Sequence, residues 1–321
     1  MVYLLQVQKK YHQSSYLIGQ ELNPKLQKLL QSQSADSDGI YSSRAGFSAD
    51  QSAEIELRER VAAEHYDNFL DAISRNHSIP VMDYEVDRFL AKLPQGALIL
   101  DIGGCWGWHW RRLAQKRPDV GVLIIDFVRS NLTHAQNVLG SLVGNQIALM
   151  HADATALPFA VDDGFQGFDG IWTVQTLQHI PDFAQAVQEA HRVLRPCGLF
   201  VNYSLHITPL HRVIYGLLGK QYHIRGVVMG AFYLARASDT QCAEVSRIFG
   251  GARVANRYTE CLFHPQFGLG FTGKKDSLLG RIDARLAAAP WFARWVARQR
   301  SFDPRQQGDA SPWNCKMDVL K

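Results

Sequence analysis

The sequence predicts an α/β fold in which helices cover both faces of a mostly parallel, doubly wound sheet. After Pro94, short apolar runs alternate with segments of helical periodicity, and this alternation is typical of βαβ units. The runs are continuously apolar, as expected of strands buried on both faces. With 321 residues, 46% of them hydrophobic and 20% charged, the chain is ordinary for a globular protein, which excludes fibrous and disordered classes.

Five apolar runs are predicted as strands and the three segments between the first and last runs as helices. The strands are residues 97–102, 120–125, 146–151, 168–173 and 199–204, and the helices are 108–117, 130–142 and 181–194. In such sheets ligands bind beyond the carboxyl ends of the strands. The residues that end each run are therefore the candidate site residues.

The remaining segments differ in composition from this core. Residues 1–60 are rich in Gln and Ser and are interpreted as a loosely attached segment, with a helical pattern starting at residue 53. We divide the chain into residues 1–60, a core of 61–204, an insertion of 205–239, the end of the core at 240–275, and an extension of 276–321. The extension is expected to be helical.

The charge of the chain is local. The net charge is +4, yet residues 270–305 hold eight Lys or Arg and three Asp, so the rest of the chain is slightly acidic. This distribution argues against a nucleic-acid partner. The basic segment has four alternative interpretations: contact with an anionic membrane surface, binding of an acidic partner, packing on the core or on another subunit, and a solvated face.

The cysteine pattern and the N-terminus give no sign of secretion. The five cysteines are widely spaced and form no Cys-x-x-Cys pair, so neither a disulfide framework nor a metal site is predicted. No apolar run approaches the ~20 residues that cross a bilayer, and the N-terminus lacks a signal-peptide pattern. A cytoplasmic location is expected.

The first predicted strand ends in LILDIGGCWGWHW, where Asp101 precedes Gly103, Gly104, Cys105 and Gly107. A glycine-rich strand-to-helix turn lets the backbone approach a ligand closely. The dinucleotide fingerprint G-x-G-x-x-G would need glycine at positions 103, 105 and 108, of which two are missing. A nicotinamide-dependent oxidoreductase is therefore disfavoured. The acid before the turn would repel a phosphate but suits a cationic ligand.

This stretch resembles the first motif of the class I S-adenosylmethionine-dependent methyltransferases, in which an acid is followed one residue later by G-x-G-x-G. The sequence departs from that pattern at Cys105. Asp126 ends the second run, 25 residues after Asp101, where an acid can accept hydrogen bonds from both ribose hydroxyls, and Phe127 would lie against the adenine. A helix-capping role for Asp126 is the alternative.

The third and fourth runs extend the resemblance. HADATALPF is similar to the segment of the methyltransferase type 11 group in which an acid and the next backbone N–H bind adenine, which implies Asp153 and Ala154. FDGIWTVQTLQHIPD looks like the family's fourth strand and its loop. The resemblance implies that Thr173 and Val174 border the methionine moiety and that residues 175–179 lie under the reactive methyl group.

His179 is the leading candidate for a general base because imidazole titrates near neutrality. Packing or capping of the next helix is the alternative role. Further candidates from the sequence are His206, His211, His223 and Tyr203, and Tyr66 for closure over the cofactor.

The resemblance covers about residues 83–275 and implies a Rossmann-like sheet of seven strands, closed by a helix at 240–249 and an antiparallel pair at 252–263 and 267–273. The insertion is interpreted as a substrate lid, with an internally packed helical pair as the alternative. The implied activity is methyl transfer from S-adenosylmethionine to a small organic acceptor with an apolar body, on an unresolved O, N or C atom. A catalytically silent relative that binds the cofactor for assembly is the alternative.

Overall fold

The computed structural model describes most of the central chain. Described are residues 21–43, 69–74, 79–162, 164–203, 226–228, 231–233, 238–250 and 313–315, with single positions between 52 and 59, at 217 and between 282 and 291. The strands are β1 (Ile40–Ser42), β2 (Leu98–Ile102), β3 (Gly121–Asp126), β4 (Ile147–His151), β5 (Phe168–Val174), β6 (Leu194–Tyr203), β7 (Gly226–Val228), β8 (Ala231–Tyr233) and β9 (Trp313–Cys315). The α-helices are α2 (Pro24–Leu30), α4 (Phe69–Ser74), α5 (Ile79–Lys92), α6 (Leu113–Lys116), α7 (Arg129–Leu139), α8 (Phe183–Val193) and α10 (Ser238–Ile248).

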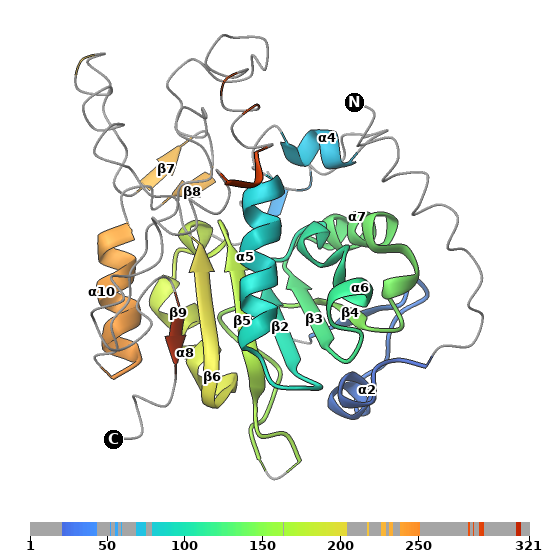
Figure 1. The fold of residues 1–321 in the computed structure, drawn as a ribbon. Helices are drawn as coiled ribbons and strands as arrows, with labels where there is room; N and C mark the ends of the chain where they lie inside the picture. Colours follow the sequence, from blue (N-terminus) through green and yellow to red (C-terminus); the bar gives the residue numbers. More distant parts are fainter. Residues whose placement is uncertain are drawn as a thin grey trace.

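A single sheet organises the described part of the chain (Figure 1), with the strand order β1-β4-β3-β2-β5-β6-β9. The first six strands run parallel, and β9 pairs antiparallel with β6. All five predicted runs form strands of this sheet, which confirms the predicted Rossmann-like α/β class. The reversal of strand order between β2 and β5 is a topological switch point, where such sheets bind ligands.

Helices cover both faces of the sheet, as the doubly wound prediction requires. One face packs against Leu26 of α2, Val187 of α8 and Val245 of α10, whereas the other packs against Phe89 of α5 and Leu132 of α7. Every residue of β2 and β3 is buried. Continuous apolar runs are therefore explained by burial of both strand faces.

The predicted helix at 108–117 is wrong as a continuous helix. Residues Trp108–Trp110 form a 3₁₀ turn (η1), and α6 begins only at Leu113. Trp108, His109 and Trp110 are all buried. Arg112, between the turn and α6, has φ and ψ values of −106° and 8°, outside the α-helical region, so the helix is interrupted there.

The interpretation of the N-terminal region as loosely attached is wrong for residues 21–43. Asn23 caps α2 through a 3.1 Å bond from the Lys25 N–H to its side chain, and Leu26 is fully buried. β1 then adds a parallel strand beside β4, and Arg129 on α7 contacts Asp36 at 2.5 Å. A capped helix and an edge strand therefore fix this segment to the sheet.

Several predictions fall on residues that the structure does not describe. The closing strand pair at 252–263 and 267–273 and most of the insertion lie outside the described residues, so the predicted closing pair stays a prediction. At that edge the described strand is β9, from the extension that was expected to be helical. Within the insertion, β7 and β8 form an antiparallel hairpin.

Among the described residues, no helix is both long enough and apolar enough to cross a membrane.

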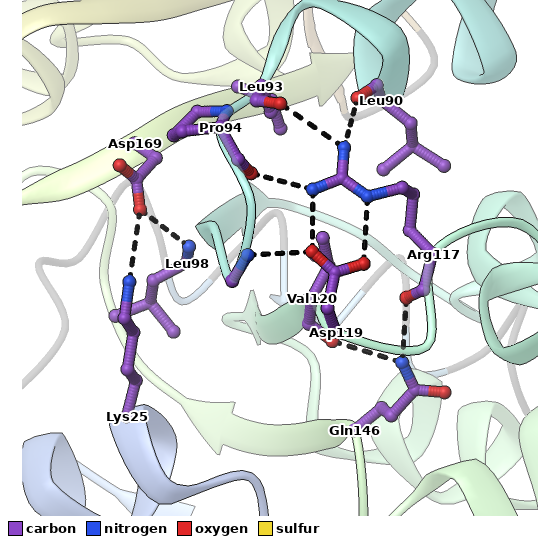
Figure 2. A network of polar contacts seen from close by, with 11 residues as sticks. Lys25, Leu90, Leu93, Pro94, Leu98, Arg117, Asp119, Val120, Gln146 and Asp169 are labelled. Atoms are coloured by element: carbon purple, nitrogen blue, oxygen red, sulfur yellow. Dashed lines mark hydrogen bonds and ion pairs between the residues drawn. The ribbon is translucent and has the colours of Figure 1, made fainter.

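A polar network centred on Arg117 joins the segments at the amino edge of the sheet (Figure 2). The guanidinium donates to the carbonyl oxygens of Leu90 and Pro94, each at 2.6 Å, and it pairs with both oxygens of Asp119 at 2.8 and 2.9 Å. Asp119 also accepts the Gly96 N–H at 2.6 Å. The Arg117 guanidinium holds the pKa of Asp119 well below its usual range. The network therefore ties the end of α5 to the starts of β2 and β3.

Substitution of Arg117 by alanine is expected to lower the free energy of unfolding by about 2–3 kcal/mol, because several charge-assisted bonds to a partly exposed group are lost together. Urea denaturation measures the effect. Arg247→Ala is the matched control, since Arg247 forms a more exposed ion pair with Glu244 on α10, and its substitution should change stability far less than that of Arg117. Equal midpoints for the two variants would contradict the assigned role.

Candidate functional site

The carboxyl ends of four neighbouring strands meet at one edge of the sheet. Asp101 pairs in register with Ile124, and Asp126 with His151. Backbone bonds continue past the strand ends, from the Gly103 N–H to the Ile125 carbonyl at 2.8 Å and from the Ala152 N–H to the Asp126 carbonyl at 3.1 Å. The predicted site segments after β2, β3 and β4 therefore lie side by side.

The turn after β2 uses three left-handed residues at alternate positions. Gly103, Cys105 and Gly107 have φ values of 65°, 50° and 64°. A Cβ on Gly103 would lie 2.1 Å from Cγ2 of Thr176, and one on Gly104 would lie 2.4 Å from Oδ2 of Asp101. Neither position has room for a side chain, so the glycines set a close approach of the backbone.

Cys105 keeps the turn despite departing from the family pattern. Its N–H donates to Oδ2 of Asp126 at 3.0 Å, which links the glycine turn to the end of β3. A left-handed non-glycine residue costs about 1–2 kcal/mol. Cys105 is a predicted site position, and strained backbone conformations are often found at functional sites.

Asp101 lies beneath the turn rather than on its surface. The side chain is 1% exposed, and Oδ2 accepts the indole N–H of Trp110 at 2.6 Å. Burial raises the pKa of Asp101 to about 7, the Trp110 hydrogen bond opposes that rise, and the nearby Asp126 charge adds to it. The two acids are thus electrostatically coupled across the strand ends, and a cation bound above the turn would favour the charged form of Asp101.

Asp101→Asn is expected to remove a pH dependence of folding stability. A carboxyl with a folded pKa of about 7 and an unfolded pKa near 4 stabilises the fold fully below about pH 4, and that contribution is lost as the pH rises to about 7. Between pH 5 and 8 the free energy of unfolding of the variant, relative to wild type, should rise by roughly 3 kcal/mol.

Urea denaturation of both proteins at pH 5, 6, 7 and 8 measures this difference, because all other titrating groups are shared. Parallel curves would contradict the assignment of the titration to Asp101.

Asp126 accepts hydrogen bonds from the glycine turn and from the start of α7. Besides the Cys105 N–H it accepts the Val128 N–H at 2.8 Å and the side-chain amide of Asn131 at 3.4 Å. The carboxylate is 5% exposed. Phe127 follows, half-buried, and its carbonyl contacts Nε2 of His151 at 3.1 Å. Asp126, the predicted ribose-binding residue, is therefore hydrogen-bonded to the glycine turn, and it also supports the start of α7.

The segment after β4 turns around Asp153. Its two carboxylate oxygens accept the N–H and the hydroxyl of Thr155 at 2.8 and 2.7 Å. Asp153 and Ala154 are 7% and 8% exposed. Both predicted adenine residues therefore occupy the strand edge beside Asp126, in a tight Asx-type turn.

The end of β5 is joined to the glycine turn by Thr176, which lies in the predicted loop of residues 175–179 but was not singled out from the sequence. The Thr176 hydroxyl donates to the Gly103 carbonyl at 3.1 Å. Gln175 adopts a left-handed φ of 53° and donates its N–H to the Tyr203 carbonyl at 2.6 Å. Thr173 is fully enclosed and Val174 is half-buried, so Val174 is the more accessible of the two predicted methionine-side residues.

The candidate bases are placed differently by the structure. His179 is half-buried in a 3₁₀ turn (η3, Leu177–His179), with Nε2 at 3.2 Å from Nε2 of Gln178, and β8 of the insertion lies close to this turn. Tyr203 as a base is wrong: the fully buried phenol donates to Glu85 of α5 within the core. His206, His211, His223 and Tyr66 lie outside the described residues.

Comparisons with known proteins locate the similarity in the same region. Residues 99–198 match a family described as a methyltransferase domain. Demethylmenaquinone methyltransferase of Staphylococcus epidermidis is 37% identical over 98 residues, 30% of this chain and 38% of the relative. Malonyl-[acyl-carrier protein] O-methyltransferase of Geobacter sulfurreducens is 32% identical over 120 residues, 37% of this chain and 43% of the relative. The chain thus spans about two fifths of these relatives.

A solved structure also resembles the chain. The S-adenosylmethionine-bound amino pentose methyltransferase of Micromonospora echinaspora has a TM-score of 0.36 and 20% identity, with 46% of this chain and 60% of that chain covered.

Proposed function

The chain contains a domain of the class I S-adenosylmethionine-dependent methyltransferase family, and from that premise we propose that it transfers a methyl group to a small organic acceptor. One observation carries the proposal. The glycine turn, Asp126 and Asp153 lie together at the carboxyl edge of the sheet, and the bond from the Cys105 N–H to Asp126 joins the turn to the end of β3. That edge offers a close backbone approach and carboxylates that suit a cationic nucleoside.

The donor fits these residues in an extended orientation across the strand ends. Asp126 would accept hydrogen bonds from the ribose hydroxyls, each worth about 1.5–3 kcal/mol. Asp153 would accept the adenine amino group, with the Ala154 N–H facing a ring nitrogen and Phe127 lying against the ring. The methionine chain would lie along the backbone of the turn at Gly103 and Gly104.

When bound, S-adenosylmethionine supplies a methyl group already activated on a sulfonium. The residues of the chain then have to hold the acceptor lone pair in line with that methyl group and exclude water, which contributes up to about 7–11 kcal/mol in favourable cases. His179 would take the acceptor's proton where one must be lost, adding ~10²- to 10⁴-fold. Its place after β5, close to β8, supports this role.

The insertion supports an acceptor with an apolar body. Its sequence YGLLGKQYHIRGVVMGAFYLAR mixes aromatic and aliphatic residues with Arg225 and Arg236, a composition suited to an apolar ligand with an anionic group. The names of the two relatives give acceptors as different as demethylmenaquinone and a malonyl-acyl carrier protein, so family membership does not fix the acceptor. The widely spaced cysteines support a cytoplasmic enzyme.

Calorimetric titration with S-adenosylmethionine, S-adenosylhomocysteine and NAD tests the proposal. We expect micromolar binding of both sulfur nucleosides and none of NAD. Release of S-adenosylhomocysteine in the presence of a panel of phenols, amines and carboxylic acids then distinguishes an enzyme from a silent binding protein. Binding of NAD alone, or of none of the three, would overturn the proposal.

A further inference from the structure

Three side chains on one face of α8 contact the loop that follows β4. Gln185, Glu189 and Arg192 are spaced by four and three residues, which places them on the same side of the helix. Their partners lie more than 29 positions earlier in the chain, in residues 153–159. The helix therefore binds the loop that carries Asp153 and Ala154.

Glu189 and Arg192 form the C-terminal half of this contact. Oε2 of Glu189 accepts the Leu157 N–H at 2.8 Å, and Nη2 of Arg192 donates to the Leu157 carbonyl at 2.9 Å. Arg192 also donates to the Phe159 carbonyl. The two side chains pair with each other at 2.7 and 2.8 Å, and Glu189 raises the pKa of Arg192. Both polar groups of the Leu157 backbone are thus held by one ion pair.

Gln185 completes the contact nearer the predicted adenine residues. Its side-chain amide donates to the Thr155 carbonyl at 3.3 Å. The N–H and hydroxyl of Thr155 in turn donate to the two oxygens of Asp153 at 2.8 and 2.7 Å. A carboxylate accepts about four hydrogen bonds, and Thr155 fills two with fixed directions. The orientation of Asp153 is therefore linked to α8 through Thr155.

We propose that Glu189 and Arg192, with Gln185, are positioning residues that hold residues 153–159 so that Asp153 reads the amino edge of a 6-aminopurine. The proposal rests on the proposed function, in which Asp153 accepts the adenine amino group. These residues touch neither the ligand nor the reacting atoms. They favour a 6-aminopurine over other purines by fixing the orientation of the Asp153 carboxylate, because a hydrogen bond weakens steeply when its donor and acceptor are misaligned.

The test compares two ligands that differ at position 6 of the purine and in the protonation of the adjacent ring nitrogen, N1. S-adenosylhomocysteine carries the purine amino group, and S-inosylhomocysteine carries an oxygen there. The ratio of their dissociation constants, measured by calorimetry on the full chain, reports purine discrimination and is insensitive to a uniform loss of stability. The wild type should prefer the adenosine ligand by about 10- to 100-fold.

Glu189→Ala should reduce that ratio by about tenfold. The ratio of Glu189→Gln should lie between those of the wild type and Glu189→Ala, because its amide oxygen still accepts the Leu157 N–H. Gln185→Ala, which leaves the ion pair intact, should reduce the ratio by a smaller factor and provides a second variant if Glu189→Ala does not fold. Glu244→Ala is the matched control, since Glu244 and Arg247 form the same i, i+3 pair on α10. It should leave the ratio unchanged.

The outcomes separate the inference from its premise. A wild type that binds neither ligand overturns the proposed function and the inference together. Equal binding of both ligands by the wild type would show that Asp153 does not recognise the purine amino group, which overturns the inference. Wild-type discrimination that persists in both Glu189→Ala and Gln185→Ala, with only the unfolding free energy lowered, overturns the inference alone and leaves the proposed function intact.

Discussion

Asp126→Ala is expected to weaken the binding of S-adenosylhomocysteine at least ~100-fold. Two charge-assisted bonds to the ribose hydroxyls contribute about 1.5–3 kcal/mol each, and their joint loss corresponds to a factor of this size. The substitution also removes the acceptor for the Cys105 and Val128 N–H groups at 3.0 and 2.8 Å. The glycine turn and the start of α7 would lose their common anchor. Calorimetry measures the affinity.

The control for this variant is Asp162→Ala. Asp162 also supports a turn, by accepting the N–H groups of Gly164 and Phe165 at 2.8 and 3.0 Å, but it is exposed on the loop that leads into β5. It should leave the affinity unchanged. Wild-type affinity in Asp126→Ala would contradict the ribose assignment, and a weakened affinity in both variants would indicate a general loss of structure.

Gly103→Ala is expected to lower the free energy of unfolding by about 2–5 kcal/mol and to abolish measurable cofactor binding. The backbone φ of 65° costs about 1–2 kcal/mol for a residue with a Cβ. That Cβ would also lie 2.1 and 2.4 Å from Cγ2 and Oγ1 of Thr176, and such overpacking costs about 1–3 kcal/mol more. Urea denaturation and calorimetry measure the two effects.

Gly144→Ala separates the cost of the left-handed backbone from the cost of the clash with Thr176. Gly144 has a φ of 82°, and a Cβ there meets nothing within 4 Å, so this variant should lose only the backbone term and bind cofactor normally. Equal destabilisation of the two variants would show that contact with Thr176 has no energetic role. Cys105 shows that the chain accepts a left-handed side chain where space allows.

The central sheet could be predicted from the sequence because its strands are buried on both faces. The runs around Leu100 and Ile124 contain no polar residue before Asp101 and Asp126, and burial of the whole strands explains this pattern. The carboxyl ends of parallel strands lie at one edge, so the residues that follow each strand were expected to be neighbours. The choice of Asp153 rested on the resemblance of its segment to the methyltransferases.

Other features depend on contacts that a local pattern does not contain. The pairing of Asp101 with Trp110, nine residues later, turns the acid beneath the glycine turn. Tyr203 ends β6 as predicted, yet the alternation of side chains along a strand places its phenol toward Glu85 on the α5 face. The choice of face required knowing the register of β6.

The N-terminal segment was wrongly interpreted as loosely attached because its composition was given more weight than a local helix signal. Residues 21–43 lie in a Gln- and Ser-rich region, but Asn23 and Pro24 before an apolar helical pattern are an N-terminal helix signature. The edge strand at Ile40 has three residues, and its pairing with Leu149 spans more than 100 positions. No short-range periodicity reports such a pairing.

A crystal structure of the chain with S-adenosylhomocysteine tests the account most directly. The account predicts ribose hydroxyls within hydrogen-bond distance of Asp126, the adenine amino group at Asp153, and the homocysteine chain along the turn at Gly103 and Gly104. A ligand bound elsewhere, or one seated at this edge with Asp126 and Asp153 both out of reach, would contradict it.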